Sequence, residues 1–146
     1  MKDAIRIRAA RPADAPALSP LCGQLGYPAD AMTIARRLQD IATHGAGVVL
    51  VAERDGAICG WAHVDPERLL VLEPRGQLAG LVVDEGQRDA GIGAALLRAA
   101  ETWTVDNGFS ELAVRSNVVR ERAHRFYLRE GYAEKKRQAV FAKGLD

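Results

Sequence analysis

A chain of 146 residues is long enough for one domain with one hydrophobic core. The net charge of +1 and the absence of a run of about 18 apolar residues argue against a nucleic-acid partner and against a membrane span. The first residues lack the apolar core of a signal peptide, and the two cysteines fit no metal-binding or redox spacing. We therefore expect a reduced, cytoplasmic protein with no metal.

The first third of the chain predicts a strand followed by two helices. Ile5 and Ile7 alternate with arginines, as in a short half-buried strand. Apolar residues then recur at helical spacing after Pro12 and again over residues 30–43, and Gly26 separates the two runs. Both helices should pack one apolar face against a core.

Two strands joined by a tight turn follow. Residues 48–52 and 58–64 are rich in apolar and β-branched residues, and Asp55-Gly56 between them is a strong hairpin signal. These strands should be antiparallel neighbours. Residues 66–76 leave two alternatives open, because they could continue the second strand or form an apolar loop.

The most informative stretch joins a strand to a glycine-bearing loop and a helix. Leu81, Val82 and Val83 are consecutive apolar residues, which is typical of a strand covered on both faces. Gly91 and Gly93 then stand directly before a helical apolar pattern. The first amides of a helix have no partners within it, and the helix dipole is positive there. The stretch is therefore expected to bind phosphate.

Two common phosphate motifs do not fit this stretch. A P-loop requires Lys and then Ser or Thr where this chain has Ile92 and Gly93. A dinucleotide fingerprint requires a small residue where this chain has Leu96. Neither a nucleoside triphosphate nor NAD is therefore expected.

The C-terminal part predicts a strand over residues 111–115, a helix that runs to about Glu130, and last strands at Tyr132 and over residues 138–142. Ser116 and Asn117 are candidate N-caps of that helix. The element order predicts a single α/β or α+β domain. Its mixed, mostly antiparallel sheet should carry helices on both faces.

Two sets of residues resemble the GNAT family of N-acetyltransferases. Residues 88–93 resemble its pyrophosphate loop, in which Gln or Arg, two residues, Gly, one residue, and Gly or Ala follow a strand. A later set resembles its second motif, namely Asn117, Ala123, Phe126, Tyr127, Gly131 and Tyr132. The resemblance covers essentially the whole chain, residues 1–146.

The resemblance implies an acyl-CoA N-acyltransferase-like fold. It also implies direct transfer of an acetyl group from acetyl-CoA to a primary amine within a ternary complex. The central strand would pair with the pantetheine arm, the loop would hold the pyrophosphate, and the Asn side chain would contact the pantetheine amides. The implied cofactor-binding residues are Leu81, Val82, Val83, Arg88, Asp89, Ala90, Gly91, Ile92, Gly93 and Asn117.

The same resemblance implies that Tyr127 is the general acid for the departing thiolate. A main-chain amide near Val83 is expected to stabilise the oxyanion. Many relatives place a Glu on the central strand as the base, whereas residues 77–80 contain no carboxylate. Glu73 is the first candidate in its place, with His63 or a relayed water as alternatives.

The acceptor is expected to be a small molecule, bound by the two early helices and residues 66–76. Polyamines, aminoglycosides, amino-acid derivatives and protein N-termini or lysines all stay open. Two other classes compete, namely a catalytically silent acyl-CoA-binding module and a structural domain. In the structural alternative Leu69–Leu72 would form an interface, and a homodimer is possible.

Overall fold

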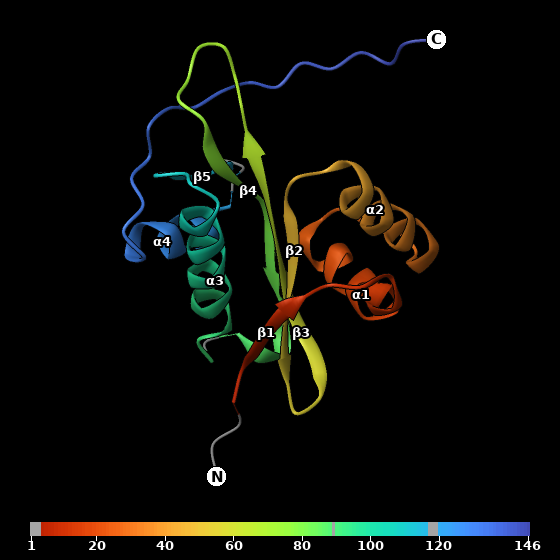
Figure 1. The fold of residues 1–146 in the computed structure, drawn as a ribbon. Helices are drawn as coiled ribbons and strands as arrows, with labels where there is room; N and C mark the ends of the chain where they lie inside the picture. The colour runs from red at the N-terminus through yellow and green to blue at the C-terminus, as the bar shows by residue number, and fades with distance from the viewer. Residues whose placement is uncertain (1–3, 89, 117–119) are drawn as a thin grey trace. The chain divides into compact units, whose positions relative to one another are not determined.

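The computed structural model describes residues 4–88, 90–116 and 120–146 (Figure 1). The chain divides into two compact units, Met1–Arg115 and Ser116–Asp146, each with its own secondary structure. None of the described helices is both long enough and apolar enough to span a membrane.

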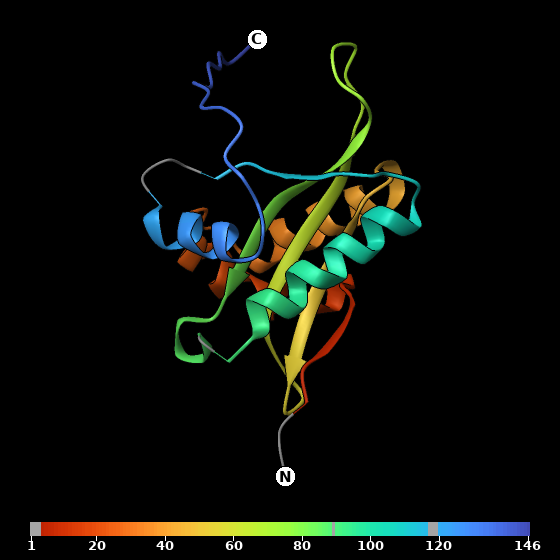
Figure 2. The same ribbon diagram turned by 90° about the vertical axis from the view of Figure 1, so that its left-hand side faces the viewer.

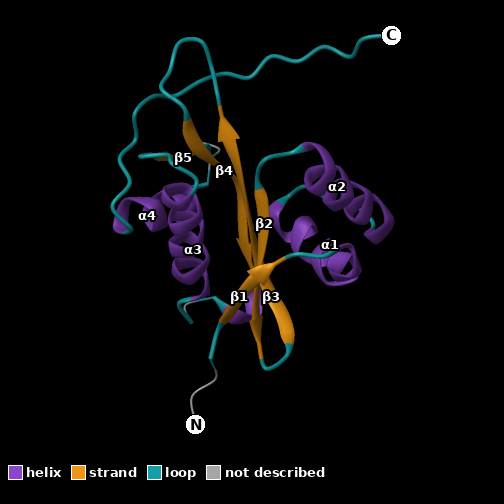
Figure 3. Cartoon of the chain, in the orientation of Figure 1, coloured by secondary structure: helices purple, strands orange, loops and turns teal. Residues whose placement is uncertain are grey.

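The first unit is a five-stranded sheet with helices on both faces. In chain order its elements are β1 (Arg6–Ala9), the 3₁₀ turn η1 (Pro12–Asp14), α1 (Ala15–Leu25), α2 (Ala31–His44), β2 (Val48–Arg54), β3 (Ala57–Glu67), β4 (Arg75–Val83), the 3₁₀ turn η2 (Glu85–Gln87), α3 (Ile92–Asp106) and β5 (Leu112–Val114). The strands lie in the order β1-β2-β3-β4-β5, and only the pair β4–β5 is parallel. Helices α1 and α2 cover one face and α3 covers the other (Figures 1 and 3). The predicted mixed, mostly antiparallel sheet is confirmed.

The predicted hairpin forms at Asp55-Gly56. Both residues have positive φ, 55° and 78°, as the tightest hairpin turns require. The open question about residues 66–76 is also answered, because β3 continues only to Glu67 and β4 begins at Arg75. The intervening loop is apolar yet exposed, with Leu70 fully accessible to solvent.

The core lies on both faces of the sheet. On the face of α1 and α2, a buried cluster includes Leu18, Leu38 and Val82. On the opposite face α3 runs across the strands in close contact with them (Figure 2). A Cβ at Gly76 would lie only 2.8 Å from Oγ1 of Thr104 on α3, so the helix can approach β4 only because that position is glycine.

The second unit contains one described helix, α4 (Glu121–Arg129), which ends before Gly131 as predicted. Its N-cap is Arg120, so the predicted cap at Ser116 is wrong. Helical geometry begins only at Glu121. Asn117 itself lies outside the described residues.

The predicted last strands are also wrong within the described residues, because positions 133–146 hold neither helix nor strand. Val140 and Phe141 are instead about nine-tenths exposed. A short apolar run makes a stable strand only where a neighbouring strand pairs with it.

Candidate active site

Strand β4 loses its neighbour on one side partway along its length. β5 pairs with β4 only from Gly76 to Leu78. On the other side β3 pairs with β4 as far as Val83. No other strand of the described chain pairs with Ala79–Val83 on the β5 side, and we call this segment the free edge of β4.

The alternation of main-chain groups along β4 can be followed from its start. The amide of Gly76 donates to the carbonyl of Glu111 at 3.0 Å, so Gly76 and then Leu78 turn their main-chain groups towards β5. A register shift follows, because one additional residue, Ala79, stands between the positions that pair with β3. Such a bulge moves the alternation by one residue.

The other end of β4 gives the same result independently. The amide of Asp84 donates to the carbonyl of Cys59 at 2.8 Å. Two residues earlier, Val82 therefore also turns its main-chain groups towards β3. It follows that Leu81 and Val83 turn their N–H and C=O groups towards the free edge, where an extended ligand could pair with them.

The amides at the start of α3 have no hydrogen-bond partner among the described residues. Gly91 is the N-cap with φ 82°, a left-handed conformation that favours glycine, and no side chain caps the helix. The first main-chain bond of the helix runs from Ala95 to Gly91 at 3.0 Å. None of the hydrogen bonds among the described residues uses the amides of residues 91–94. This donor set and the positive helix end fit a diphosphate.

The predicted phosphate-loop residues differ in what they can offer a ligand. Arg88, Ala90 and Gly91 are exposed, so a guanidinium and main-chain amides are both accessible. The side chain of Ile92 is buried in the core, which leaves only its main chain for a ligand. Asp89 lies outside the described residues, and its role stays a prediction.

The central strand is less buried than its sequence suggested. Val82 is buried in the core, whereas Leu81 and Val83 are only half-buried. The expectation of cover on both faces is therefore corrected for these two residues. The missing neighbour on the β5 side explains the exposure.

A polar group lies beside the free edge on the neighbouring strand. His63 of β3 is opposite Gly80, and Asp65 is opposite Gln77. The Nε2 atom of His63 is buried and has no hydrogen-bond partner among the described residues. Burial lowers the pKa of His63, against a smaller opposing effect of Asp65, so the imidazole is neutral at pH 7 and can accept a proton.

Glu73, the first candidate for the base, is exposed in the loop between β3 and β4. Its proposed role stays a prediction. In the described part of the chain no group of three or more His, Cys, Asp or Glu side chains could hold a metal ion.

A buried carboxylate that sequence reasoning missed ties the strands together where β4 and β5 pair. Glu67 accepts from Nε of Arg75 and from Arg115, each at 2.7 Å. These contacts join β3, β4 and the residue that follows β5. No pattern around Glu67 pointed to it, because Arg115 is far away in sequence.

The second unit carries the predicted general acid. Tyr127 on α4 is half-buried and makes edge-to-face contacts with Phe126 and Tyr132, at centroid distances of 5.2 and 5.9 Å. Burial raises the pKa of Tyr127 to about 12. The phenol is therefore protonated at neutral pH and available as a donor.

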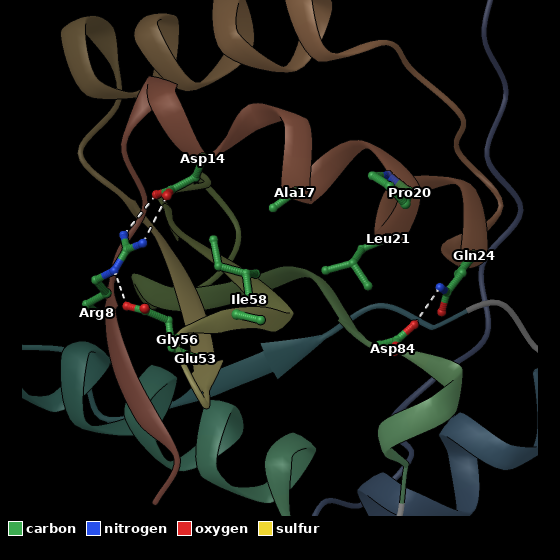
Figure 4. Close-up of a pocket in the computed structure, with 11 residues that line it drawn as sticks. Arg8, Asp14, Ala17, Pro20, Leu21, Gln24, Glu53, Gly56, Ile58 and Asp84 are labelled. Carbon is green, nitrogen blue, oxygen red and sulfur yellow. Dashed lines mark hydrogen bonds and ion pairs between the residues drawn. The ribbon is translucent and has the colours of Figure 1, made fainter.

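A hollow of about 490 Å³ lies between α1 and the ends of β2 and β3 (Figure 4). Within it Arg8 binds Asp14 at 2.8 and 2.9 Å and also binds Glu53. Hydrogen bonds from Arg8 lower the pKa of Asp14. Arg8 pairs with both carboxylates, so neither of them is without a partner, although one positive charge balances only one of the two negative charges.

Comparison with known proteins agrees with this geometry. The model of the acetyltransferase (GNAT) family matches residues 18–132. An aminoglycoside N(6')-acetyltransferase type 1 of Stenotrophomonas maltophilia is 35% identical over 145 residues, covering 96% of this chain and 94% of that protein. The chain therefore belongs to the acetyltransferase (GNAT) family.

Solved structures show the same fold. An aminoglycoside N-acetyltransferase, AAC(6')-Iy, in complex with CoA has a TM-score of 0.86 at 18% identity, covering 98% of this chain and 97% of that one. AAC(6')-IG from Acinetobacter haemolyticus has a TM-score of 0.81 at 23% identity, covering 97% and 99%. The predicted family and fold, and an enzyme that transfers an acetyl group from acetyl-CoA to an amine, are confirmed.

Proposed function

We propose that the protein acetylates the 6'-amino group of an aminoglycoside. The observation that carries this acceptor is the match to the S. maltophilia enzyme, which extends over nearly the full length of both chains. The likeness to solved structures supports the fold, and the free edge of β4 with the start of α3 supports acetyl-CoA as the donor.

Coenzyme A is proposed to lie along the free edge and to end at α3. The pantetheine arm would pair with the outward main-chain groups of Leu81 and Val83. The diphosphate would take the free amides of residues 91–94, with Arg88 adding a positive charge. Contacts from Asp89 and Asn117 follow from the family resemblance alone.

The proposed reaction is a direct transfer. The neutral amine attacks the thioester carbon, and a C–N bond forms while the carbonyl oxygen becomes an oxyanion. The amide of Val83 donates a hydrogen bond to that oxyanion. The C–S bond then breaks, the sulfur leaves as a thiolate and receives a proton from Tyr127, and a base removes the surplus proton from nitrogen.

The pKa of Tyr127, about 12, restricts its role. A phenol with this pKa is a weaker acid than an ordinary thiol, so full proton transfer to sulfur is unfavourable by itself. The base therefore passes the proton that it removed from nitrogen back to the Tyr127 phenolate, so that one proton moves from nitrogen to sulfur overall. Tyr127 would therefore act as a donor that passes on a proton originating from the amine.

Two residues compete for the base. Glu73 remains a candidate because its carboxylate can accept a proton. Its position in an exposed loop counts against it. His63 is favoured by its neutral imidazole, by the buried and unpartnered Nε2 atom and by its place opposite Gly80. We take His63 as the first choice.

Three broader proposals accompany this function. Residues 1–146 would form one catalytic domain, which is supported by a family match that extends into both compact units. A homodimer is supported by exposed apolar side chains at Leu70, Val71 and Phe141. A cytoplasmic location is supported by the use of acetyl-CoA and by two free cysteines.

The test is thiol release from acetyl-CoA with two aminoglycosides that differ only in a 6'-amino or a 6'-hydroxyl group. A polyamine and a peptide with a free N-terminus serve as further acceptors. Release with the 6'-amino compound alone is expected. Release with the peptide alone would replace the proposal with a protein acetyltransferase. Thermal stabilisation by coenzyme A without any release would favour the catalytically silent module.

A further inference from the structure

We propose that Gln24, at the end of α1, positions the loop that binds the diphosphate. The inference rests on the proposed function, because that loop matters only if it holds coenzyme A. Gln24 belongs to a helix on one face of the sheet, whereas the amides at issue begin α3 on the other face (Figure 1).

Both the NH2 group and the carbonyl oxygen of the Gln24 side chain form hydrogen bonds. Its Nε2 donates to Oδ1 of Asp84 at 2.9 Å, as Figure 4 shows. Its Oε1 accepts from the main-chain amide of Glu85, also at 2.9 Å. These two partners are consecutive residues directly after β4, so one side chain fixes the point where the chain leaves the sheet.

Main-chain bonds hold the same turn from the sheet. The amide of Asp84 donates to Cys59 of β3 at 2.8 Å, and the amide of Gln87 donates back to Asp84 at 2.9 Å. Arg88 follows immediately, and α3 begins four residues later. A displaced turn would therefore displace the donors of the phosphate loop relative to the free edge of β4.

The helix that carries Gln24 is anchored in the hydrophobic core. Leu21, one turn earlier in α1, is buried in the core, and α1 ends at Gly26, whose φ is 100°. The helix thus provides a rigid support that reaches the turn through one side chain. The hydrogen bonds join residues 60 and 61 positions apart in sequence.

Only a side chain with a donor and an acceptor can make both contacts. Glutamate has the same shape as glutamine, but it cannot donate when ionised and would face the carboxylate of Asp84. Alanine would remove both bonds without adding a charge. Gln24→Glu should therefore weaken coenzyme A binding more than Gln24→Ala does.

Gln24 is a positioning residue, since its hydrogen bonds are with the turn and with no catalytic candidate. Its loss should raise the KM for acetyl-CoA and leave the KM for the acceptor unchanged. Loss of both hydrogen bonds should weaken coenzyme A binding by about tenfold or more. The rate at saturating acetyl-CoA should change by less than about threefold, because the reacting groups are untouched.

The experiment measures coenzyme A affinity by calorimetry and both KM values for four variants. Gln24→Glu is the main variant, and Gln24→Ala tests loss without added charge. The double variant Gln24→Glu with Asp84→Asn keeps the wild-type net charge and restores the bonds, since the introduced asparagine amide can donate to the introduced glutamate carboxylate. Gln39→Glu is the matched control, because Gln39 is an exposed residue of α2.

The expected result is weaker coenzyme A binding in Gln24→Glu, recovery in the double variant and wild-type behaviour in Gln39→Glu. Equal affinity in wild type and both single Gln24 variants would overturn the inference, as would a failure of the double variant to recover. If Gln24→Glu does not fold, the comparison of wild type with Gln24→Ala decides the question. Failure of the proposed function is distinct, because then the wild type itself would not bind coenzyme A.

Discussion

Leu78 of β4 lies opposite Val114 of β5, and this is the last pair that the described part of these two strands makes. Beyond it β4 continues to Val83, and within residues 4–88, 90–116 and 120–146 only β3 pairs with it there. Since a bulge at Ala79 resets the alternation, the main-chain groups of Leu81 and Val83 turn towards the unpaired side.

The free edge predicts different effects of proline at adjacent positions. Val83→Pro removes an amide that faces the free edge, so the protein should fold. Its kcat/KM should fall by about 100- to 1000-fold, because the proposed oxyanion donor is lost. Val82→Pro removes an amide that faces β3, so it should lower the free energy of unfolding by about 1–3 kcal/mol more than Val83→Pro does. Urea unfolding and steady-state kinetics check both statements, and equal activity of Val83→Pro and wild type would remove the Val83 amide from the mechanism.

The two ends of α3 offer a matched pair of glycines. Gly91 and Gly108 have φ values of 82° and 88°, and a Cβ at either would meet no atom within 4 Å. Alanine at each position should therefore cost a similar free energy of unfolding, about 1–2 kcal/mol. Only Gly91→Ala should weaken coenzyme A binding, by about tenfold, because its methyl group would occupy the approach to the free amides. Calorimetry on both variants is the measurement, and equal coenzyme A affinity in the two would contradict the phosphate site.

Tyr127→Phe removes the proposed proton donor and keeps the ring. We expect kcat to fall by about 100-fold or more while coenzyme A affinity is retained. Tyr132→Phe is the control, because it removes a neighbouring phenol in the same unit. A rate for Tyr127→Phe that equals the wild-type rate across the pH range would exclude Tyr127 as the donor.

The half-buried His63 predicts a pH dependence of stability. Its pKa is lowered from 6.5 in the folded state, so the unfolded state binds more protons at acidic pH. The contribution is fully present above pH 6.5 and is lost as the pH falls towards the folded-state pKa. The ordinary pKa of Asp14 is 3.8 and its folded-state pKa is lower still, so its contribution is lost at more acidic pH.

His63→Gln should therefore flatten the decline of Tm as the pH falls below 6.5. If His63 is also the base, the same variant should lower kcat/KM by about 100-fold at pH 7. A flattened Tm profile with full activity would support the lowered pKa of His63 but reject its role as the base. Glu73 would then become the first candidate for the base.

Local chemistry explains which parts of the fold could be predicted. The Asp55-Gly56 hairpin and the Gly91 helix start depend on residues with particular φ preferences, which can be recognised within a few positions. The end of β4–β5 pairing at Leu78 depends on a bulge and on another strand, and no local pattern marks it. The same applies to Gln24, whose partners are 60 and 61 residues away.

The errors have a related origin. The apolar run within residues 138–142 is typical of a strand, but a strand also needs a partner, and the described chain provides none there. Ser116 was a good cap by residue type, yet the helix begins only at Glu121. In both cases the segment has a local preference for one structure, whereas its neighbours in space determine the structure that forms.

The central claim is that the free amides at the start of α3 bind the diphosphate of coenzyme A. Amide chemical shifts of Gly91, Ile92 and Gly93, followed by NMR during titration with coenzyme A and with acetyl-pantetheine, test it most directly. We predict large shifts at these amides with coenzyme A and small ones with acetyl-pantetheine, which lacks the diphosphate. Saturable binding of coenzyme A that leaves these amides unshifted would contradict the account.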